Sequence, residues 1–290
     1  MVEKRGREQP IMPLAGQELI EEIRSTEVPY GCLAVWFLGQ ASIIVKGAGV
    51  TVYIDPYVSP NPDRTFPPPV GPGEITNMEV CLITHDHSDH LDEEALPVLA
   101  GLNPQAQFMA PAVCLERLQA LGIRKEQLTA ALPASETEPA SGLKVIPVAA
   151  AHEQPERDEQ GHPKYVGYIL ELNGVTLYHA GDTVLFPELI EEVGSRKIDL
   201  ALLPINGRDY YRGSRNIVGN MNYREAAEFA ATSGFETVVP LHYDLFAGNA
   251  ENPGYFVDHL YRHFPEQKFH MMARAERFVY VSAQAFKRER

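Results

Sequence analysis

The sequence is poor in cysteine and lacks long apolar runs, and each shortage excludes a class of protein. Its 3 cysteines, Cys32, Cys81 and Cys114, are too few and too widely spaced for a disulfide framework or a C-x-x-C redox pair. No stretch approaches the roughly 18 apolar residues of a membrane span. Residues 1–10 are charged and polar, without the apolar segment of a secretory signal. We therefore expect a reduced, cytoplasmic location and no membrane association.

Basic residues are also scarce, with 25 Lys and Arg against 39 Asp and Glu and a formal net charge of −14. Nucleic acids and anionic membranes are bound by dense basic surfaces, so we expect neither as a partner. A few arginines in one pocket can still bind a small phosphorylated molecule. The 44% of apolar residues suffice for a sizeable core, and we expect residues 1–290 to form a single domain.

Apolar runs of strand length alternate with amphipathic stretches, which predicts an α/β (α+β) protein with one strand-then-helix half after the other. Asn173-Gly174 favours a type I′ turn and thus a tight hairpin. The predicted strands are 35–38, 42–45, 51–55, 80–84, 144–149, 165–172, 176–180, 200–204 and 238–240, and the predicted helices are 17–25, 93–100, 223–232 and 253–263.

Prolines concentrate in residues 58–74, which contain six of them. Such a run cannot form a central strand, so we expect a loop. Its position after the strand at 51–55 suggests that it lies near a functional site, as a rim or lid of that site. A passive surface connection is the alternative.

The strongest motif is THDHSDH at 84–90, which follows the apolar run 80–83. Three histidines, His85, His87 and His90, and the carboxylate of Asp89 form an H-x-H-x-D-H pattern. Imidazole and carboxylate together suit zinc, manganese, iron or nickel. A strand that ends in a turn can direct alternate side chains to two different ions, so the spacing predicts two metal sites.

Three further candidate ligands, His152, Asp182 and His242, each come just after a predicted strand. Loops at the ends of strands would direct them to the same end of the sheets. Gly181 permits a sharp bend before Asp182. His179, within a strand, is expected to be a packed, hydrogen-bonded histidine, with a supporting role near the metals as the alternative.

This ordered set resembles the metallo-β-lactamase superfamily of hydrolases. The resemblance implies a four-layer αββα sandwich and two divalent ions, Mn²⁺ or Zn²⁺, with iron also suitable. It also implies the role of each ligand: His85, His87 and His152 for the first ion, Asp89, His90 and His242 for the second, Asp182 as the bridge, and Asp55 as a partner that orients the ligand loop.

Four segments more particularly resemble the L-ascorbate-6-phosphate lactonase group: WFLG at 36–39, THDHSDHLD at 84–92, YHAGD at 178–182 and VPLHYD at 239–244. The sequence departs from that group at Asn220, where a basic residue is expected, and at Tyr243, where a second histidine is expected. The segment between Asp55 and Thr84 is also shorter.

The predicted mechanism uses a hydroxide that bridges the two metals and attacks a carbonyl or phosphorus centre. Asp182, Asp89 and Asp244 are the candidate catalytic carboxylates. Asp182 or Asp244 would pass the proton to the leaving oxygen, and the alternative for Asp244 is a cap on the turn that follows it.

Substrate recognition is predicted for the polar loop 206–222. Its arginines could bind a phosphate, and the alternative is a surface loop paired with acids such as Asp209. The candidate substrate-binding residues are Arg208, Tyr210, Arg212, Arg215 and Asn216.

The leading hypothesis is therefore a lactonase or related carboxylic-ester hydrolase acting on a small, phosphorylated, sugar-derived substrate. The runner-up is a phosphodiesterase acting on nucleotides or phospholipid head groups. A non-catalytic metal-binding module, a thiolesterase and a β-lactamase remain open alternatives. Resemblance to an oligomeric group is the one reason to expect a homo-oligomer.

Overall fold

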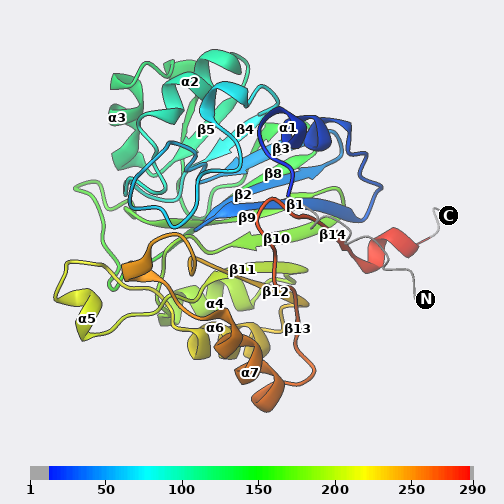
Figure 1. The fold of residues 1–290 in the computed structure, drawn as a ribbon, viewed down its shortest axis with the longest axis vertical. Coiled ribbons are helices and arrows are strands. Elements are labelled where there is room, and N and C mark those ends of the chain that lie inside the picture. The colour runs from blue at the N-terminus through cyan, green and yellow to red at the C-terminus, as the bar shows by residue number, and fades with distance from the viewer. Residues whose placement is uncertain (1–12, 288–290) are drawn as a thin grey trace, which may run out of the picture.

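The computed structural model describes residues 13–287, which form two β-sheets packed face to face with helices on both outer sides (Figure 1). The polar segment 1–10 lies outside the described residues. The four-layer αββα arrangement expected from the resemblance is confirmed. That the chain forms one domain stays a prediction.

The first sheet has the strand order β14-β1-β2-β3-β4-β5-β6. Strands β3, β4, β5 and β6 run parallel to one another. The pairs β14–β1, β1–β2 and β2–β3 are antiparallel. The bounds are β1 (Cys32–Gly39), β2 (Ser42–Gly47), β3 (Val50–Ile54), β4 (Val80–Leu82), β5 (Gln107–Ala110), β6 (Leu128–Ala130) and β14 (Arg277–Val281).

The second sheet repeats this scheme in the order β13-β12-β11-β10-β9-β8-β7. Here β10 to β13 are parallel, and β7 to β10 pair antiparallel. The bounds are β7 (Thr137–Ala140), β8 (Leu143–Ala149), β9 (Val166–Leu172), β10 (Val175–His179), β11 (Leu200–Pro204), β12 (Thr237–Leu241) and β13 (Lys268–Phe269).

The helices lie outside the sheets, in two groups (Figure 1). The first group comprises α1 (Gly16–Ser25), α2 (Ala95–Leu102) and α3 (Leu115–Ala120), on the side of the first sheet. The second comprises α4 (Pro187–Gly194), α6 (Tyr223–Thr232) and α7 (Pro253–His263), on the side of the second sheet. No helix within residues 13–287 has the length and apolarity needed to cross a bilayer.

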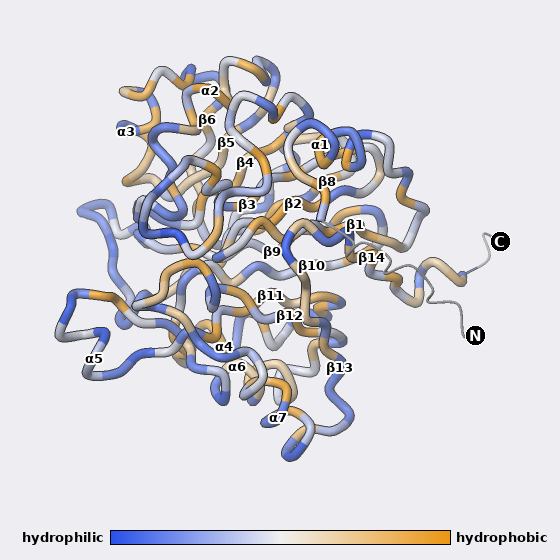
Figure 2. Tube along the Cα trace, viewed as in Figure 1, coloured by the Kyte–Doolittle hydropathy of each residue, from blue (hydrophilic) through white to orange (hydrophobic). Residues whose placement is uncertain are grey.

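Strand β1 is buried on both faces, and its alternate side chains belong to two different cores. Leu33, Val35 and Phe37 join the core between the two sheets, whereas Ala34 and Trp36 join the core beneath the first group of helices. Successive side chains of a strand point to opposite faces, so an unbroken apolar run suits a layer covered on both sides. Figure 2 shows hydrophobic stretches of the strands in the middle of the molecule.

The hairpin expected at Asn173-Gly174 is confirmed, since φ is +53° at Asn173 and +77° at Gly174 and β9 pairs antiparallel with β10. The predicted strands and helices are all present, with ends displaced by a few residues. Several short elements were not predicted, among them β5, β6 and α4. The predicted loop 206–222 contains a one-turn helix, α5 (Tyr210–Gly213).

The proline-rich segment 58–74 contains no β-strand, as expected, and contacts the stretch that follows β12. Phe66 packs in a small apolar cluster with Tyr57 and Leu245. The backbone N–H of Thr65 donates to the Leu245 carbonyl at 2.8 Å, and Arg64 forms a β-bridge with Phe246. The segment therefore supports a neighbouring loop.

Candidate metal centre

The predicted ligands come together because each follows a strand at the same end of the sheets. Asp55 follows β3 and His85 lies three residues after β4, and these two strands are parallel neighbours. In the second sheet Asp182 follows β10 and His242 follows β12. The carboxyl ends of parallel strands share one edge, which is where open α/β sheets bind ligands.

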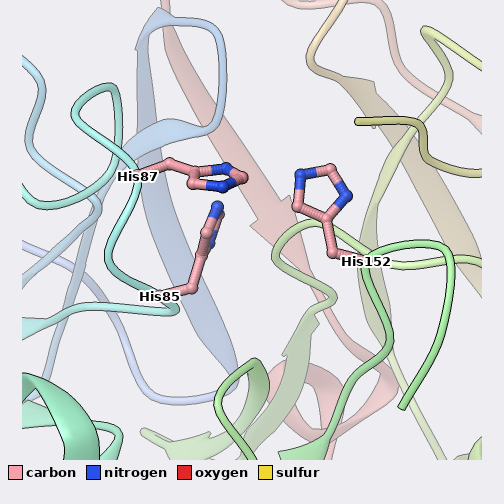
Figure 3. A group of neighbouring side chains, drawn as sticks. All are labelled: His85, His87 and His152. Atoms are coloured by element: carbon pink, nitrogen blue, oxygen red, sulfur yellow. The ribbon is translucent and has the colours of Figure 1, made fainter. Parts of the chain in front are cut away.

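All seven predicted ligands lie in one cluster that divides into three overlapping groups. Within each group the potential ligand atoms lie within 4.8 Å of one another. Figure 3 shows the imidazoles of the first group converging from two separate loops. The groups are His85, His87 and His152; His85, His90 and Asp182; and Asp89, His90 and His242.

The carboxylate of Asp55 lies behind the ligands and orients two of them. Its Oδ2 lies 2.7 Å from Nδ1 of His90 and accepts a hydrogen bond from the Thr84 hydroxyl at 2.7 Å, while Oδ1 accepts from the Thr84 backbone N–H at 2.8 Å. The Thr84 hydroxyl oxygen lies 3.0 Å from Nδ1 of His85. These contacts place the protons on Nδ1, so both Nε2 atoms are free to bind a metal.

His152 is oriented in the same way by a backbone carbonyl, since its Nδ1 lies 2.9 Å from the oxygen of Gly219. His179 is the packed, hydrogen-bonded histidine expected from the sequence. Its Nε2 donates to the Ala41 carbonyl at 2.9 Å, and its Nδ1 accepts from the Gly181 N–H at 3.1 Å. His179 thereby holds the bend before Asp182.

Burial and charge set the protonation of the cluster. Burial, followed by the neighbouring His90, lowers the pKa of His85 well below its usual range, which keeps this imidazole neutral. Burial alone would raise the pKa of Asp182, but His242 and His90 outweigh it and lower that pKa well below its usual value. His85 and Asp182 are therefore in the protonation states that bind a metal. Burial alone would lower the pKa of His90 and of His242, but Asp182 outweighs it and raises both, so these two imidazoles would give up a proton when an ion binds.

Several buried polar atoms of the cluster have no hydrogen-bond partner in the described structure: Nε2 of His85, Nε2 of His90 and Oδ1 of Asp182. Unpaired buried polar atoms are costly and call for an explanation. Each of these atoms is a good ligand for a divalent ion, and Nε2 of His90 lies 3.5 Å from Oδ1 of Asp182. The residues therefore fit a transition-metal centre.

A cavity of about 400 Å³ opens directly onto the cluster. Five candidate ligands line its floor, namely His87, Asp89, His152, Asp182 and His242. The walls come from two further segments of the chain: Asn216, Ile217 and Val218, and Phe246, Gly248 and Asn249. This cavity has the size of a small-molecule site.

Of the five predicted substrate-binding residues, Asn216 lines the cavity and the other four do not. Arg208 forms a two-pronged ion pair with Glu225, at 2.7 Å for each prong. Arg212 pairs with Asp209, which is the arrangement of the surface-loop alternative. Arg215 stacks on the Tyr211 ring at 3.7 Å. Tyr210 is 90% exposed.

Asp244, the third candidate catalytic carboxylate, does not line the cavity. Its Oδ1 accepts from the backbone N–H of Gln40 at 3.2 Å, and its Oδ2 accepts from Nε of Arg274 at 3.3 Å. Asp244 thus braces the turn between β1 and β2. Asp89 and Asp182, in contrast, do line the cavity.

The sequence interpretation missed Gln40 and the apolar walls of the cavity. Nε2 of Gln40 donates to Oδ2 of Asp89 at 2.8 Å and lies 3.0 Å from Nε2 of His242. The signal that could have drawn attention to Gln40 is a long polar side chain just after an apolar strand, flanked by Gly39 and Ala41. The walls, from Ile217, Val218 and Phe246, carry no such signal.

Comparisons with known proteins agree with this geometry. A family model described as a beta-lactamase superfamily domain matches residues 51–243. A UPF0173 metal-dependent hydrolase from Caldivirga maquilingensis is 32% identical over 221 residues, 76% of this chain and 86% of that protein. A UPF0173 metal-dependent hydrolase from Pyrococcus horikoshii is 30% identical over 226 residues, 77% and 89% of the two chains.

A solved structure with the same fold is that of Igni18, described as a novel metallo hydrolase from Ignicoccus hospitalis. It aligns with a TM-score of 0.67 and 24% identity, over 86% of this chain and 98% of that one. The matched family region, 51–243, contains Asp55 and all seven candidate ligands, so the class is the β-lactamase superfamily of metal-dependent hydrolases. Within that class, this chain belongs to the UPF0173 metal-dependent hydrolase family.

Replacing Asp55 with Asn is expected to weaken metal binding by about 10-fold to 100-fold, because one oxygen can no longer serve both His90 and Thr84. Equilibrium dialysis against Mn²⁺ or Zn²⁺ would measure it. Asp92→Asn is the matched control, since Asp92 is equally buried and accepts from the N–H groups of Val58 and Ser59 instead of from a ligand. Equal metal affinity of Asp55→Asn and wild type would contradict the orienting role.

Replacing Gly181 with Ala is expected to destabilise the protein and displace Asp182. Gly181 has φ +61°, and a Cβ there would lie 2.8 Å from the Val166 carbonyl oxygen. Gly142→Ala is the control, because Gly142 has φ +77° but open space around it, so it should lose only about 1–2 kcal/mol of unfolding free energy. Denaturant unfolding would compare the two, and equal losses would show that the backbone contact is unimportant.

Proposed function

We propose that the chain hydrolyses a small lactone or related carboxylic ester, using two divalent ions held by the seven-residue cluster. The observation that carries the proposal is a cavity of about 400 Å³ lined by five of the seven predicted ligands. One of them, Asp182, has a buried oxygen without a hydrogen-bond partner in the described structure. A closed four-ligand shell would be typical of a structural metal site. A ligand-rich floor open to a cavity is instead suited to admitting water and a substrate.

His85, His87 and His152 would hold one ion, and Asp89, His90 and His242 would hold the other, with Asp182 between them. The spacing within each group supports this division. Bound ions of this kind supply Lewis acidity and lower the pKa of coordinated water to about 7. The proposed metals are Mn²⁺ or Zn²⁺, and iron suits the same ligands.

The remaining work falls to the residues of this chain. Asp55, Thr84 and the Gly219 carbonyl fix the imidazole orientations of His90, His85 and His152. Asp182 and Asp89, which line the cavity, are the carboxylates that can accept a proton from the attacking water or return it to the leaving oxygen. Asp244, which is hydrogen-bonded to Gln40 and Arg274, takes a bracing role instead.

The walls support a substrate with an apolar ring and a few polar substituents. Ile217, Val218 and Phe246 supply the apolar contacts, and the amides of Asn216 and Asn249 supply polar ones. No Lys or Arg is among the described residues that line the cavity. A compact lactone matches this lining better than a dianionic substrate that is wholly enclosed.

A phosphoryl substituent would instead extend to the mouth of the cavity. Of the three arginines in the loop, Arg208 and Arg212 already pair with carboxylates. The hydrogen bonds of the Arg215 guanidinium in the described structure go to the Tyr211 carbonyl and the Ser214 hydroxyl. Arg215 is exposed and precedes the lining residue Asn216, so it is the proposed contact for an anionic group.

The direct test is a panel of sugar lactones, with and without a phosphate, together with aryl esters and aryl phosphodiesters, each assayed with added Mn²⁺ or Zn²⁺. Lactone opening that disappears with a chelator and returns with metal is expected. Asp182→Ala should lower kcat/KM by at least about 100-fold, because Asp182 belongs to the shared part of the cluster.

Asp199→Ala is the control for that experiment. Asp199 is a buried aspartate at the opposite end of β10 and β11, where its Oδ2 accepts from the Thr176 N–H at 2.9 Å. Its removal should affect stability more than kcat. Turnover of phosphodiesters without lactone opening would move the function to the phosphodiesterase alternative, and no turnover with bound metal would favour a non-catalytic module.

Replacing Arg215 with Ala is expected to raise KM by about 10-fold or more for a phosphorylated lactone, because a charge-assisted hydrogen bond is lost. The KM for the same lactone without phosphate should stay within about two-fold. Arg208→Ala, which removes an arginine already paired with Glu225, should leave the ratio of the two KM values unchanged. An equal rise for both substrates in Arg215→Ala would argue against a phosphate contact.

A further inference from the structure

Gln40 occupies a constrained position in the turn between β1 and β2. It is 1% exposed and has φ +57°, a conformation that is unfavourable for a residue with a side chain. Hydrogen bonds on both sides hold it there. Its backbone N–H donates to Asp244 at 3.2 Å, and its carbonyl accepts from the backbone N–H of His242 at 2.8 Å.

The next residue adds a third hydrogen bond to the turn, since the Ala41 carbonyl accepts from Nε2 of His179 at 2.9 Å. The turn is therefore attached to the loops that carry His242 and Asp182. A residue held this firmly in an unfavourable conformation is typical of a functional site.

The side chain of Gln40 extends into the cluster. Its Nε2 donates to Oδ2 of Asp89 at 2.8 Å and lies 3.0 Å from Nε2 of His242. These are two of the three residues in the group Asp89, His90 and His242. The carboxylate of Asp89 is the more exposed of the two ligands, with a side chain 19% exposed against 2% for His242, so a fixed donor has the larger part in orienting it.

We infer that Gln40 is a positioning residue that sets the affinity of the second metal site, formed by Asp89, His90 and His242. This inference rests on the proposed two-metal function. The amide holds the Asp89 carboxylate in the orientation that faces His242, and it thereby lowers the entropy lost when an ion binds. The first site, formed by His85, His87 and His152, has its own supports in Thr84 and the Gly219 carbonyl.

Two substitutions at this position separate positioning from a general structural effect. Gln40→Met keeps the length and burial of the side chain but removes the donor. Gln40→Glu keeps the size and also removes the donor, but it adds a negative charge beside the second site, which attracts a cation. The order of second-ion affinity is expected to be Gln40→Glu at or above wild type, and Gln40→Met about 10-fold to 100-fold below it.

The matched control is Gln127→Met. Gln127 is also a buried glutamine, 3% exposed, and its Nε2 donates to the Ala106 carbonyl at 3.0 Å, away from the cluster. Both binding steps of Gln127→Met should match those of wild type. The thermal unfolding of each metal-free variant would be measured to establish that every variant is folded before metal is added.

The experiment is a titration of metal-free protein with Mn²⁺ against a chelating indicator, which resolves the two binding steps without an activity assay. Support for the inference is a weakened second step in Gln40→Met with a first step within about two-fold of wild type. Equal weakening of both steps in both Gln40 variants would make the role structural and overturn the inference. So would two unchanged steps.

The same titration distinguishes failure of the inference from failure of the proposed function. Wild-type protein that binds one ion at saturation would overturn the two-metal site, and the role of Gln40 with it. Wild-type protein that binds two ions, with Gln40→Met indistinguishable from it, would overturn the role of Gln40 alone.

Discussion

The buried Asp55 carboxylate is the group on which the rest of the centre depends. It accepts from the backbone and the hydroxyl of Thr84 and contacts His90. Thr84 in turn accepts a hydrogen bond through its carbonyl from the N–H of Val166, in β9 of the second sheet, at 3.0 Å. One carboxylate thus fixes the loop after β4 and, through Thr84, joins that loop to the opposite sheet.

The centre also concentrates charge among buried side chains. Asp182 is 3% exposed and His85 and His90 are fully buried, and burying an ionised group without compensation is expensive. The imidazoles offset part of this cost, and divalent cations would offset the rest. Because ligand affinity for the folded state adds to stability, occupancy of the centre and resistance to unfolding should rise together.

The layers and the ligands could be predicted from the sequence because each rests on a local pattern. Every ligand follows an apolar strand, and parallel strands bring their ends to one edge whatever the loops between them do. The roles of Arg208 and Arg212 could not be predicted from the sequence. Each arginine could bind either a substrate or a nearby carboxylate, Glu225 or Asp209, and only the packing of the folded chain decides between them. Gln40 reaches Asp89 across 49 positions of sequence, and no local pattern encodes that contact.

The wall of the cavity formed by Phe246, Gly248 and Asn249 is attached separately from the metal centre. Asn206 and Arg212 both donate to Oδ1 of Asn249, at 3.0 and 3.3 Å, and Arg212 also donates to the Ala250 carbonyl at 2.8 Å. None of these four residues is a candidate ligand. Substitutions in this short segment can therefore reshape the substrate cavity while the metal chemistry is preserved, which gives a lineage a route to new substrates on one reactive core.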